Sequence, residues 1–146
     1  MVWRRLHAAG AALWVVAIIV QVVLAGLALA NLGGSGDFAT HIEFGYDIGL
    51  LQFLVLLLAF PARLPRRDVL ISLAILVDYV VQTLLPLART VVPFIAALHP
   101  LNATILFTLS LWYARHAWRT AMAPAPVAAV ATLPTDPSAS ADTMDG

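Results

Sequence analysis

The sequence contains no cysteine. This excludes disulfides, thiolate nucleophiles, thiolate-ligated metals and covalent c-type haem attachment. Charged residues are also scarce, at 11% of the chain against about a quarter in an ordinary soluble domain. The net charge is zero, which argues against a nucleic-acid partner. With 62% hydrophobic residues, the chain is expected to be an integral membrane protein whose first partner is the lipid bilayer.

The chain also lacks the residue groupings of common enzymes. It has no glycine-rich phosphate loop, no nucleophile paired with a base, and no soluble segment that could hold two catalytic carboxylates. This argues against a hydrolase or a kinase, and the sequence names no reaction. The residues that could bind a metal are eight carboxylates and four histidines, which are His7, His41, His99 and His116.

Four apolar runs predict an all-α membrane protein, a bundle of four transmembrane helices in residues 1–122. A spanning helix needs about 20 apolar residues, and the predicted spans are about 8–32, 38–60, 68–86 and 93–118. Asp68 is expected to cap the third span. Either Pro93 or Pro100 begins the fourth, because proline suits a first helical turn. Residues 123–146 are rich in Ala, Pro, Ser, Thr and Asp, which predicts a disordered tail.

The first run could instead be a signal peptide, since Arg4 and Arg5 precede it and Ala28-Leu29-Ala30 resembles a cleavage site. Signal peptides carry apolar regions of about 7–15 residues, and this run is longer, so we expect a retained span. With four spans, only Arg89 falls on the side away from the other arginines. The positive-inside rule then places the protein in the inner (plasma) membrane, with both termini cytoplasmic.

The two halves of the chain resemble each other. Each has a glutamine inside its first helix, Gln21 or Gln82, and a histidine near the start of its second, His41 or His99. The glutamine-to-histidine separations are 20 and 17 residues, so a repeat would have drifted. Two similar hairpins would pack as a four-helix bundle about a pseudo-two-fold axis along the membrane normal.

His41 and His99 are the candidate ligands of a haem. Both fall at the outer end of the predicted bundle, on helices that can lie diagonally, and haem iron takes axial ligands from opposite faces. Gly45 and Gly49 follow His41 at helical spacing, and Ala103 follows His99, so small residues would leave room for a porphyrin. Arg89 would pair with haem propionates, or with one of the outer carboxylates Asp37, Glu43 and Asp47.

Other interpretations of these residues stay open. The histidines could be solvated at the membrane interface, and the glycines could form a close helix–helix contact. Zinc or copper would need a third or fourth ligand. His7 and His116, near the inner surface, could bind a second haem, although flanking Arg and Trp residues favour ordinary interfacial positions.

Polar residues inside the spans form a second set of candidates. Asp78 lies deep in the third span, where a carboxylate costs about 2.5–3.5 kcal/mol on insertion scales. It could transfer protons, contact a substrate, or donate a neutral hydrogen bond to Gln21 or a nearby carbonyl. Gln21, Gln52 and Gln82 are expected either to hydrogen-bond between helices or to contact haem or a quinone.

The motifs carry a family resemblance. The segment from Gln21 to Gly26, His41 with Gly45, Gln82, and His99-Pro100-Leu101-Asn102-Ala103 resemble a family of small uncharacterised four-helix bacterial membrane proteins. The order of the motifs also resembles one four-helix half of haem A synthase, whose histidines ligate haem. That enzyme typically has Glu before and Arg after its helix-two histidine, whereas Thr40 and Ile42 stand there in this chain. The resemblance therefore implies haem ligation by His41 and His99, and not haem hydroxylation.

Two functions follow as hypotheses. The first is a b-type haem protein, with one haem between His41 and His99 near the outer leaflet, for electron transfer or haem handling. Its partner would be a quinone or a membrane redox protein. The alternative is a non-haem accessory subunit or a carrier of small solutes or protons, centred on Asp78. Apart from these two hypotheses, a quinone-linked enzyme stays open as a third.

Overall fold

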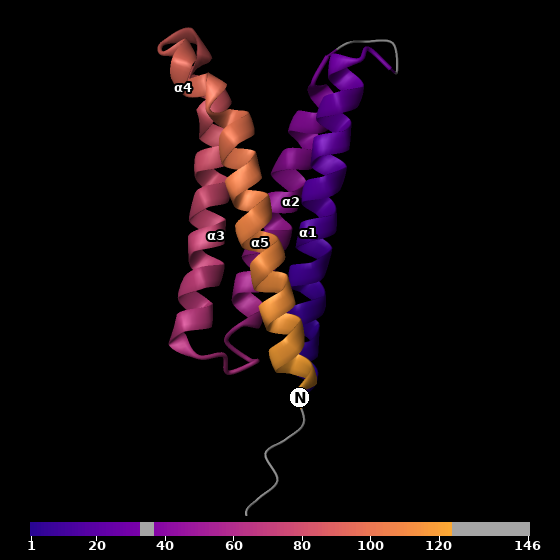
Figure 1. The fold of residues 1–146 in the computed structure, drawn as a ribbon, viewed down its shortest axis with the longest axis vertical. Coiled ribbons are helices and arrows are strands. Elements are labelled where there is room, and N and C mark those ends of the chain that lie inside the picture. Colours follow the sequence, from indigo (N-terminus) through magenta and orange to yellow (C-terminus); the bar gives the residue numbers. More distant parts are fainter. Residues whose placement is uncertain (33–36, 124–146) are drawn as a thin grey trace, which may run out of the picture.

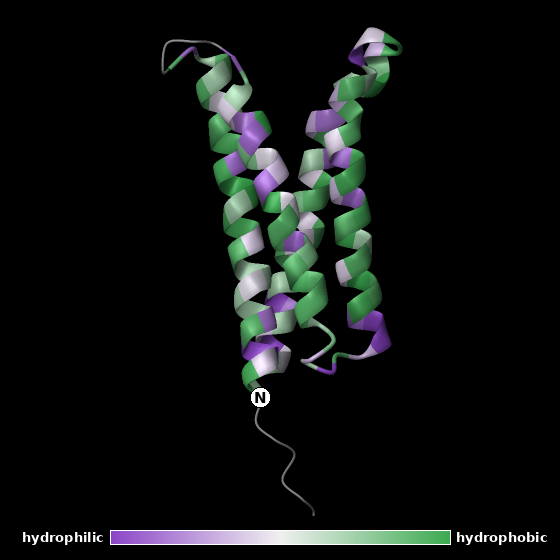
Figure 2. Ribbon diagram, turned by 180° about the vertical axis from the view of Figure 1, so that it is seen from behind, coloured by the Kyte–Doolittle hydropathy of each residue, from purple (hydrophilic) through white to green (hydrophobic). Residues whose placement is uncertain are grey.

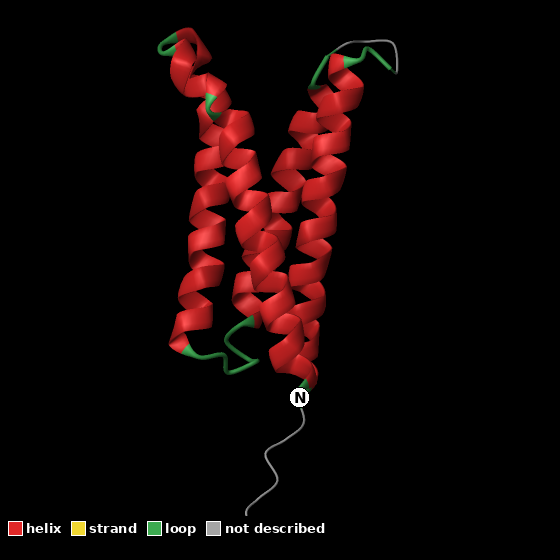
Figure 3. Cartoon of the chain, in the orientation of Figure 1, coloured by secondary structure: helices red, strands yellow, loops and turns green. Residues whose placement is uncertain are grey.

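A computed structural model describes residues 1–32 and 37–123, and within them every regular element is helical (Figure 3). The elements are α1 (Val2–Leu29), α2 (Ala39–Leu58), α3 (Arg66–Leu84), the 3₁₀ helix η1 (Leu85–Thr90), α4 (Pro93–Ala97) and α5 (His99–Met122). The tail predicted to be disordered lies, from residue 124 onward, outside the described residues.

Prolines determine where the second hairpin changes direction. Helix α3 ends before Pro86, which lies in η1. Pro93 begins the short α4, and Pro100 lies in the first turn of α5. Both prolines therefore begin a helix, each in a first turn where the missing N–H costs nothing. The N-cap of α3 is Pro65 and not Asp68, so the expectation that Asp68 caps this helix is wrong.

The four long helices form a square bundle. Helix α1 packs against both α2 and α5, and α3 packs against the same two helices. Helices α2 and α5 therefore occupy opposite corners. Figure 1 shows the α1–α2 and α3–α5 pairs close together near the N-terminus and diverging toward the other end.

Four segments are long and apolar enough to cross a membrane: Val2–Leu29, Ala39–Leu58, Arg66–Thr90 and Pro93–Met122. Large hydrophobic side chains are exposed along all four, including Leu13, Leu50, Val77 and Ile105. Figure 2 shows green, hydrophobic ribbon over most of the bundle. An apolar outer surface of this extent suits lipid rather than water, which suggests a multi-pass membrane protein.

The core positions recur between the two halves. Every residue that is buried in α3, apart from Gln82, lies 61 positions after a buried residue of α1, and Gln82 itself lies 61 after the half-buried Gln21. The pairs are His7 with Asp68, Ala11 with Ser72, Trp14 with Ile75, and Ile18 with Tyr79. The buried residues of α5 likewise lie 58 positions after buried ones near α2, namely Ile48 with Leu106, Gln52 with Ser110, Val55 with Tyr113, Leu56 with Ala114, and Ala59 with Ala117.

Candidate functional site

His41 and Gln21 form a bonded pair across α1 and α2. The His41 Nδ1 atom lies 3.0 Å from the backbone oxygen of Gln21, so this nitrogen is the one that carries the proton and donates. The Gln21 side-chain amide donates to the backbone oxygen of His41 at 2.7 Å and lies 3.3 Å from His41 Nε2. In His41, Nδ1 therefore faces the backbone carbonyl and Nε2 faces the Gln21 amide.

His99 and Gln82 repeat this arrangement across α3 and α5. His99 Nδ1 donates to the backbone oxygen of Gln82 at 3.0 Å, and His99 Nε2 lies 3.3 Å from the Gln82 amide nitrogen. His99 is the first residue of α5, while His41 lies in the first turn of α2. In each hairpin the second helix thus begins beside a carbonyl of the first, and the imidazole bridges the two.

The two imidazoles meet at the diverging end of the bundle. The ring centroids of His41 and His99 are 6.5 Å apart, with ring planes at 80°. Both side chains are half-buried. Helices α2 and α5 lie diagonally across the bundle, so the two rings come from opposite corners. This diagonal placement is one that the sequence allowed.

The glycines below His41 admit protein side chains. A Cβ atom added to Gly45 would lie 2.9 Å from the amide nitrogen of Gln21, and one added to Gly49 would lie 2.7 Å from the Tyr79 ring. The Tyr79 hydroxyl donates to the backbone oxygen of Gly45. These two positions therefore admit the side chains of Gln21 and Tyr79 close to the backbone of α2. Ala103, four residues after His99, is half-buried.

Asp78 and Asn102 lie in the half of the bundle that holds the His99–Gln82 pair, and not in the half that holds the His41–Gln21 pair. The Asn102 amide donates to Gln82 Oε1 at 2.9 Å and contacts the backbone oxygen of Asp78 at 3.5 Å. The Oδ2 atom of Asp78 is buried and finds no hydrogen-bond partner among the described residues. The Oε1 atom of Gln21, which has no asparagine beside it, is also unpartnered.

The remaining candidates separate into structural and exposed positions. Gln52 is buried and donates to the backbone oxygen of Ser72 at 3.1 Å, which is the interhelical role expected for it. Arg89 is exposed in η1, and Glu43 and Asp47 are exposed on α2. Within the described part of the chain, no three His, Asp or Glu side chains gather as a metal site, so zinc and copper gain no support.

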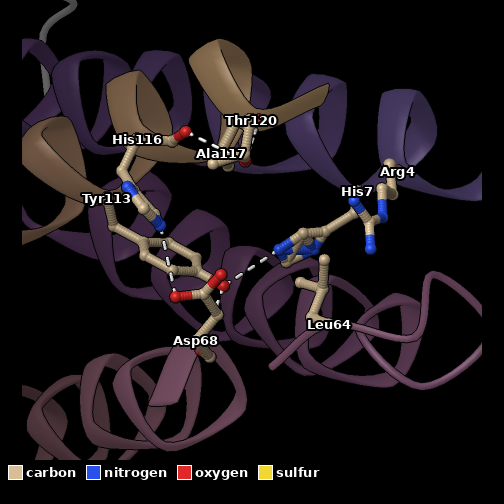
Figure 4. Close-up of a pocket in the computed structure, with 8 residues that line it drawn as sticks. All are labelled: Arg4, His7, Leu64, Asp68, Tyr113, His116, Ala117 and Thr120. Carbon is tan, nitrogen blue, oxygen red and sulfur yellow. Dashed lines mark hydrogen bonds and ion pairs between the residues drawn. The ribbon is translucent and has the colours of Figure 1, made fainter. Parts of the chain in front are cut away.

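A second polar cluster, at the N-terminal end of the bundle, was not expected from the sequence (Figure 4). His7 is 1% exposed, and its Nε2 lies 3.0 Å from the Tyr113 hydroxyl, which donates to the backbone oxygen of Asp68 at 3.1 Å. The Asp68 carboxylate lies 3.2 Å from His116, whose ring stacks on Trp112. The expectation that His7 is an ordinary interfacial residue is wrong, since it is a core residue.

This cluster borders a cavity of about 10 Å³, lined also by Arg4, Leu64 and Thr120. That is about the volume that one water molecule requires. Since the Tyr113 proton goes to Asp68, His7 must donate through Nε2, and its buried Nδ1 has no partner among the described residues. Aligning the two halves would have placed His7 and Asp68 at equivalent core positions, which is a sequence signal for their burial.

Comparison with known proteins gives one match. Residues 21–91 are similar to a family of unknown function (DUF6220), over just under half of the chain. The matched segment contains Gln21, His41 and Gln82 and ends before His99. No curated protein and no solved structure matches the chain.

Proposed function

We propose that this chain is an integral membrane b-type haem protein that holds one haem between His41 and His99, for electron transfer or haem handling. When bound, haem supplies one-electron redox chemistry. The observation that carries the proposal is the meeting of two imidazoles from opposite corners of the bundle, each with its Nδ1 proton directed at a carbonyl.

The chemistry of the donors favours an iron ligand. Histidines that bind metals usually donate their other ring N–H to a carboxylate or a backbone carbonyl, which fixes the tautomer and orients the ring. Gln21 and Gln82 provide such carbonyls, so Nε2 is the ligating atom in both rings. The glutamine amides that lie 3.3 Å from Nε2 would give up those contacts. Gln21 would keep its bond to the His41 carbonyl.

The ring separation also supports the proposal. An imidazole nitrogen lies about 2.0–2.1 Å from a bound metal, so the ring centroids of two histidines that held one metal between them would be roughly 6 Å apart. The observed separation is 6.5 Å. Two histidines would suffice to hold a haem, whereas zinc would need three or four protein ligands. Arg89 is the cation proposed for the propionates, whereas Gly45 and Gly49 are left out of the porphyrin contacts.

The membrane setting completes the proposal. The recurring buried positions support two pseudo-repeated hairpins, with the histidine pair near their shared axis. Seven of the eight arginines favour an inner-membrane protein with both termini in the cytoplasm and the histidines toward the outer leaflet. An electron partner would then be a quinone or a membrane redox protein that approaches from the outer half of the bilayer.

The test is to purify the full chain in detergent from cells that are well supplied with haem, and to record a reduced-minus-oxidised spectrum. We expect one haem per chain in wild type and loss of most of it in His41→Ala and in His99→Ala. The control is His116→Ala, which removes a half-exposed histidine at the other end and should retain haem. A colourless wild-type protein would overturn the proposal.

A second candidate function is favoured by Asp78, whose buried Oδ2 atom has no partner. Such a carboxyl inside a span is typical of a proton pathway, so a proton or small-solute carrier, or an accessory subunit to one, is the alternative. In liposomes with a trapped pH dye, Asp78→Asn should abolish a proton flux that the exposed-site control Asp47→Asn retains. Equal flux in both variants would exclude a carrier centred on Asp78.

A further inference from the structure

A groove of about 650 Å³ lies between α1 and α5, near the end of the bundle that holds the N-terminus. Its volume falls in the range of about 300–1,000 Å³ that is typical of small-ligand sites. Seven residues line it, which are Ala12, Val15, Leu111, Ala114, Arg115, Trp118 and Arg119.

Small residues form this groove. Ala12 and Val15 lie one turn apart on α1, and Ala114 faces the groove from α5. Their short side chains leave a hollow between two helices that pack closely elsewhere. Leu111 continues the apolar wall toward the middle of the bundle. One end of the groove therefore has the apolar lining that an acyl chain would need.

The other end of the groove is cationic. Arg115 and Arg119 are one helical turn apart on α5, so they lie on the same face. Both are exposed, and none of the described residues that line the groove is acidic. Trp118 stands beside them with 49% of its surface exposed, as is common for tryptophan at the level of lipid headgroups.

We propose that this groove binds one anionic phospholipid. The phosphate would lie between the Arg115 and Arg119 guanidinium groups, which hydrogen-bond phosphate in two directions, and an acyl chain would lie along Ala12, Val15 and Leu111. Basic pockets between transmembrane helices recognise anionic headgroups in this way. The site lies at the other end of the bundle from His41 and His99 and is independent of haem.

The experiment measures dissociation constants of the detergent-purified full chain for dioleoyl-phosphatidylglycerol and dioleoyl-phosphatidylcholine, by native mass spectrometry. Each surface arginine contributes about a fivefold effect in anionic lipid binding. We therefore expect Arg115→Gln/Arg119→Gln to weaken phosphatidylglycerol binding roughly thirtyfold and to leave phosphatidylcholine binding unchanged. The matched control, Arg66→Gln/Arg67→Gln, removes two exposed arginines from α3 and should change neither constant by more than twofold.

Two further experiments distinguish binding in the groove from general attraction of the lipid to positive charge. Ala12→Leu fills the apolar part and keeps both arginines, and should weaken phosphatidylglycerol binding about tenfold. Millimolar glycerol phosphate should not displace the lipid, since it lacks the acyl chain. Equal affinity for the two lipids in wild type, an equal loss in the Arg66/Arg67 control, or displacement by glycerol phosphate would each overturn the proposal.

Discussion

The pairs His41–Gln21 and His99–Gln82 have the same geometry in different surroundings. In both, the Nδ1-to-carbonyl distance is 3.0 Å and the distance from Nε2 to the amide nitrogen is 3.3 Å. Asn102 bonds to Gln82, whereas Phe44 occupies the matched position beside His41. The placement of the two helices therefore sets the orientation of each imidazole, because in both pairs a backbone carbonyl accepts the Nδ1 proton.

The opposite end of the bundle lacks this symmetry. There the residues at equivalent positions of the two halves differ chemically. His7 of the first half corresponds to Asp68 of the second, and Val55 corresponds to Tyr113. The hydrogen bonds at this end join α1, α3 and α5, so they hold one hairpin to the other. The histidine end therefore repeats the same hydrogen bonds in both hairpins, whereas the N-terminal end joins the hairpins through unlike residues.

The largest effect on stability is expected where matched core residues differ in size. Trp14 and Ile75 are each 1% exposed at equivalent positions. Trp14→Ala should lower the free energy of unfolding by about 3–5 kcal/mol. It also removes the bond to Ser110 and the ring contact with Tyr79. Ile75→Ala should lower the same free energy by about 2–5 kcal/mol. Unfolding in mixed micelles measures both, and a smaller loss for Trp14→Ala would contradict its place as the larger anchor.

Gly49→Ala comes next, because the new Cβ would lie 2.7 Å from the Tyr79 ring. We expect a loss of about 1–3 kcal/mol from overpacking. The control is Gly26→Ala, where a Cβ meets nothing within 4 Å and a gain of about 0.5–1 kcal/mol is expected from helix propensity. Equal thermal midpoints for the two variants would show that the Tyr79 ring does not need a glycine at position 49.

Asn102→Ala should make the His99 half resemble the His41 half. Gln82 Oε1 would lose its partner, as Gln21 Oε1 already has, at a cost of about 1 kcal/mol. The imidazole geometry should not change, since the Gln82 carbonyl remains. Nitrogen-15 chemical shifts of His99 measure this, and a change of its tautomer would mean that side chains, and not the backbone, set the geometry.

The smallest effect on stability is expected for Gly45→Ala, because the gain in helix propensity offsets the displacement of a flexible amide. The added Cβ, 2.9 Å from the Gln21 nitrogen, should still separate Gln21 from His41. The matched residue in the other half is already alanine, Ala103, so Ala103→Gly should leave the His99–Gln82 pair intact. Histidine proton exchange should therefore quicken at His41 in the first variant only. Unchanged exchange at His41 would contradict this role for Gly45.

Much of the fold followed from composition and periodicity. Four apolar runs predicted four long helices, and the glutamine and histidine positions predicted that two halves would be alike. The meeting of His41 and His99 followed from their equal depth and from the diagonal placement of their helices. None of this required knowledge of side-chain packing.

The rest depended on the rotation of each helix about its own axis. The sequence of a helix that is apolar on every face does not reveal this rotation. His7 looked like an interfacial residue because it stands near arginine and tryptophan, and only the packing of α1 on α5 buries it. The neighbours of Gly45 and Gly49, which are Gln21 and Tyr79, could not be predicted, because the sequence does not say which side chain faces a glycine. Asn102 acquired a role only through contact with Gln82.

The most direct test of the account is the spin state of ferric iron in the purified, haem-loaded protein, measured by electron paramagnetic resonance. If both imidazoles are axial ligands, wild type should give a low-spin signal, and His41→Ala and His99→Ala should each give a high-spin signal from the haem that remains. A high-spin wild type, or one variant that stays low-spin, would contradict ligation by His41 and His99 together.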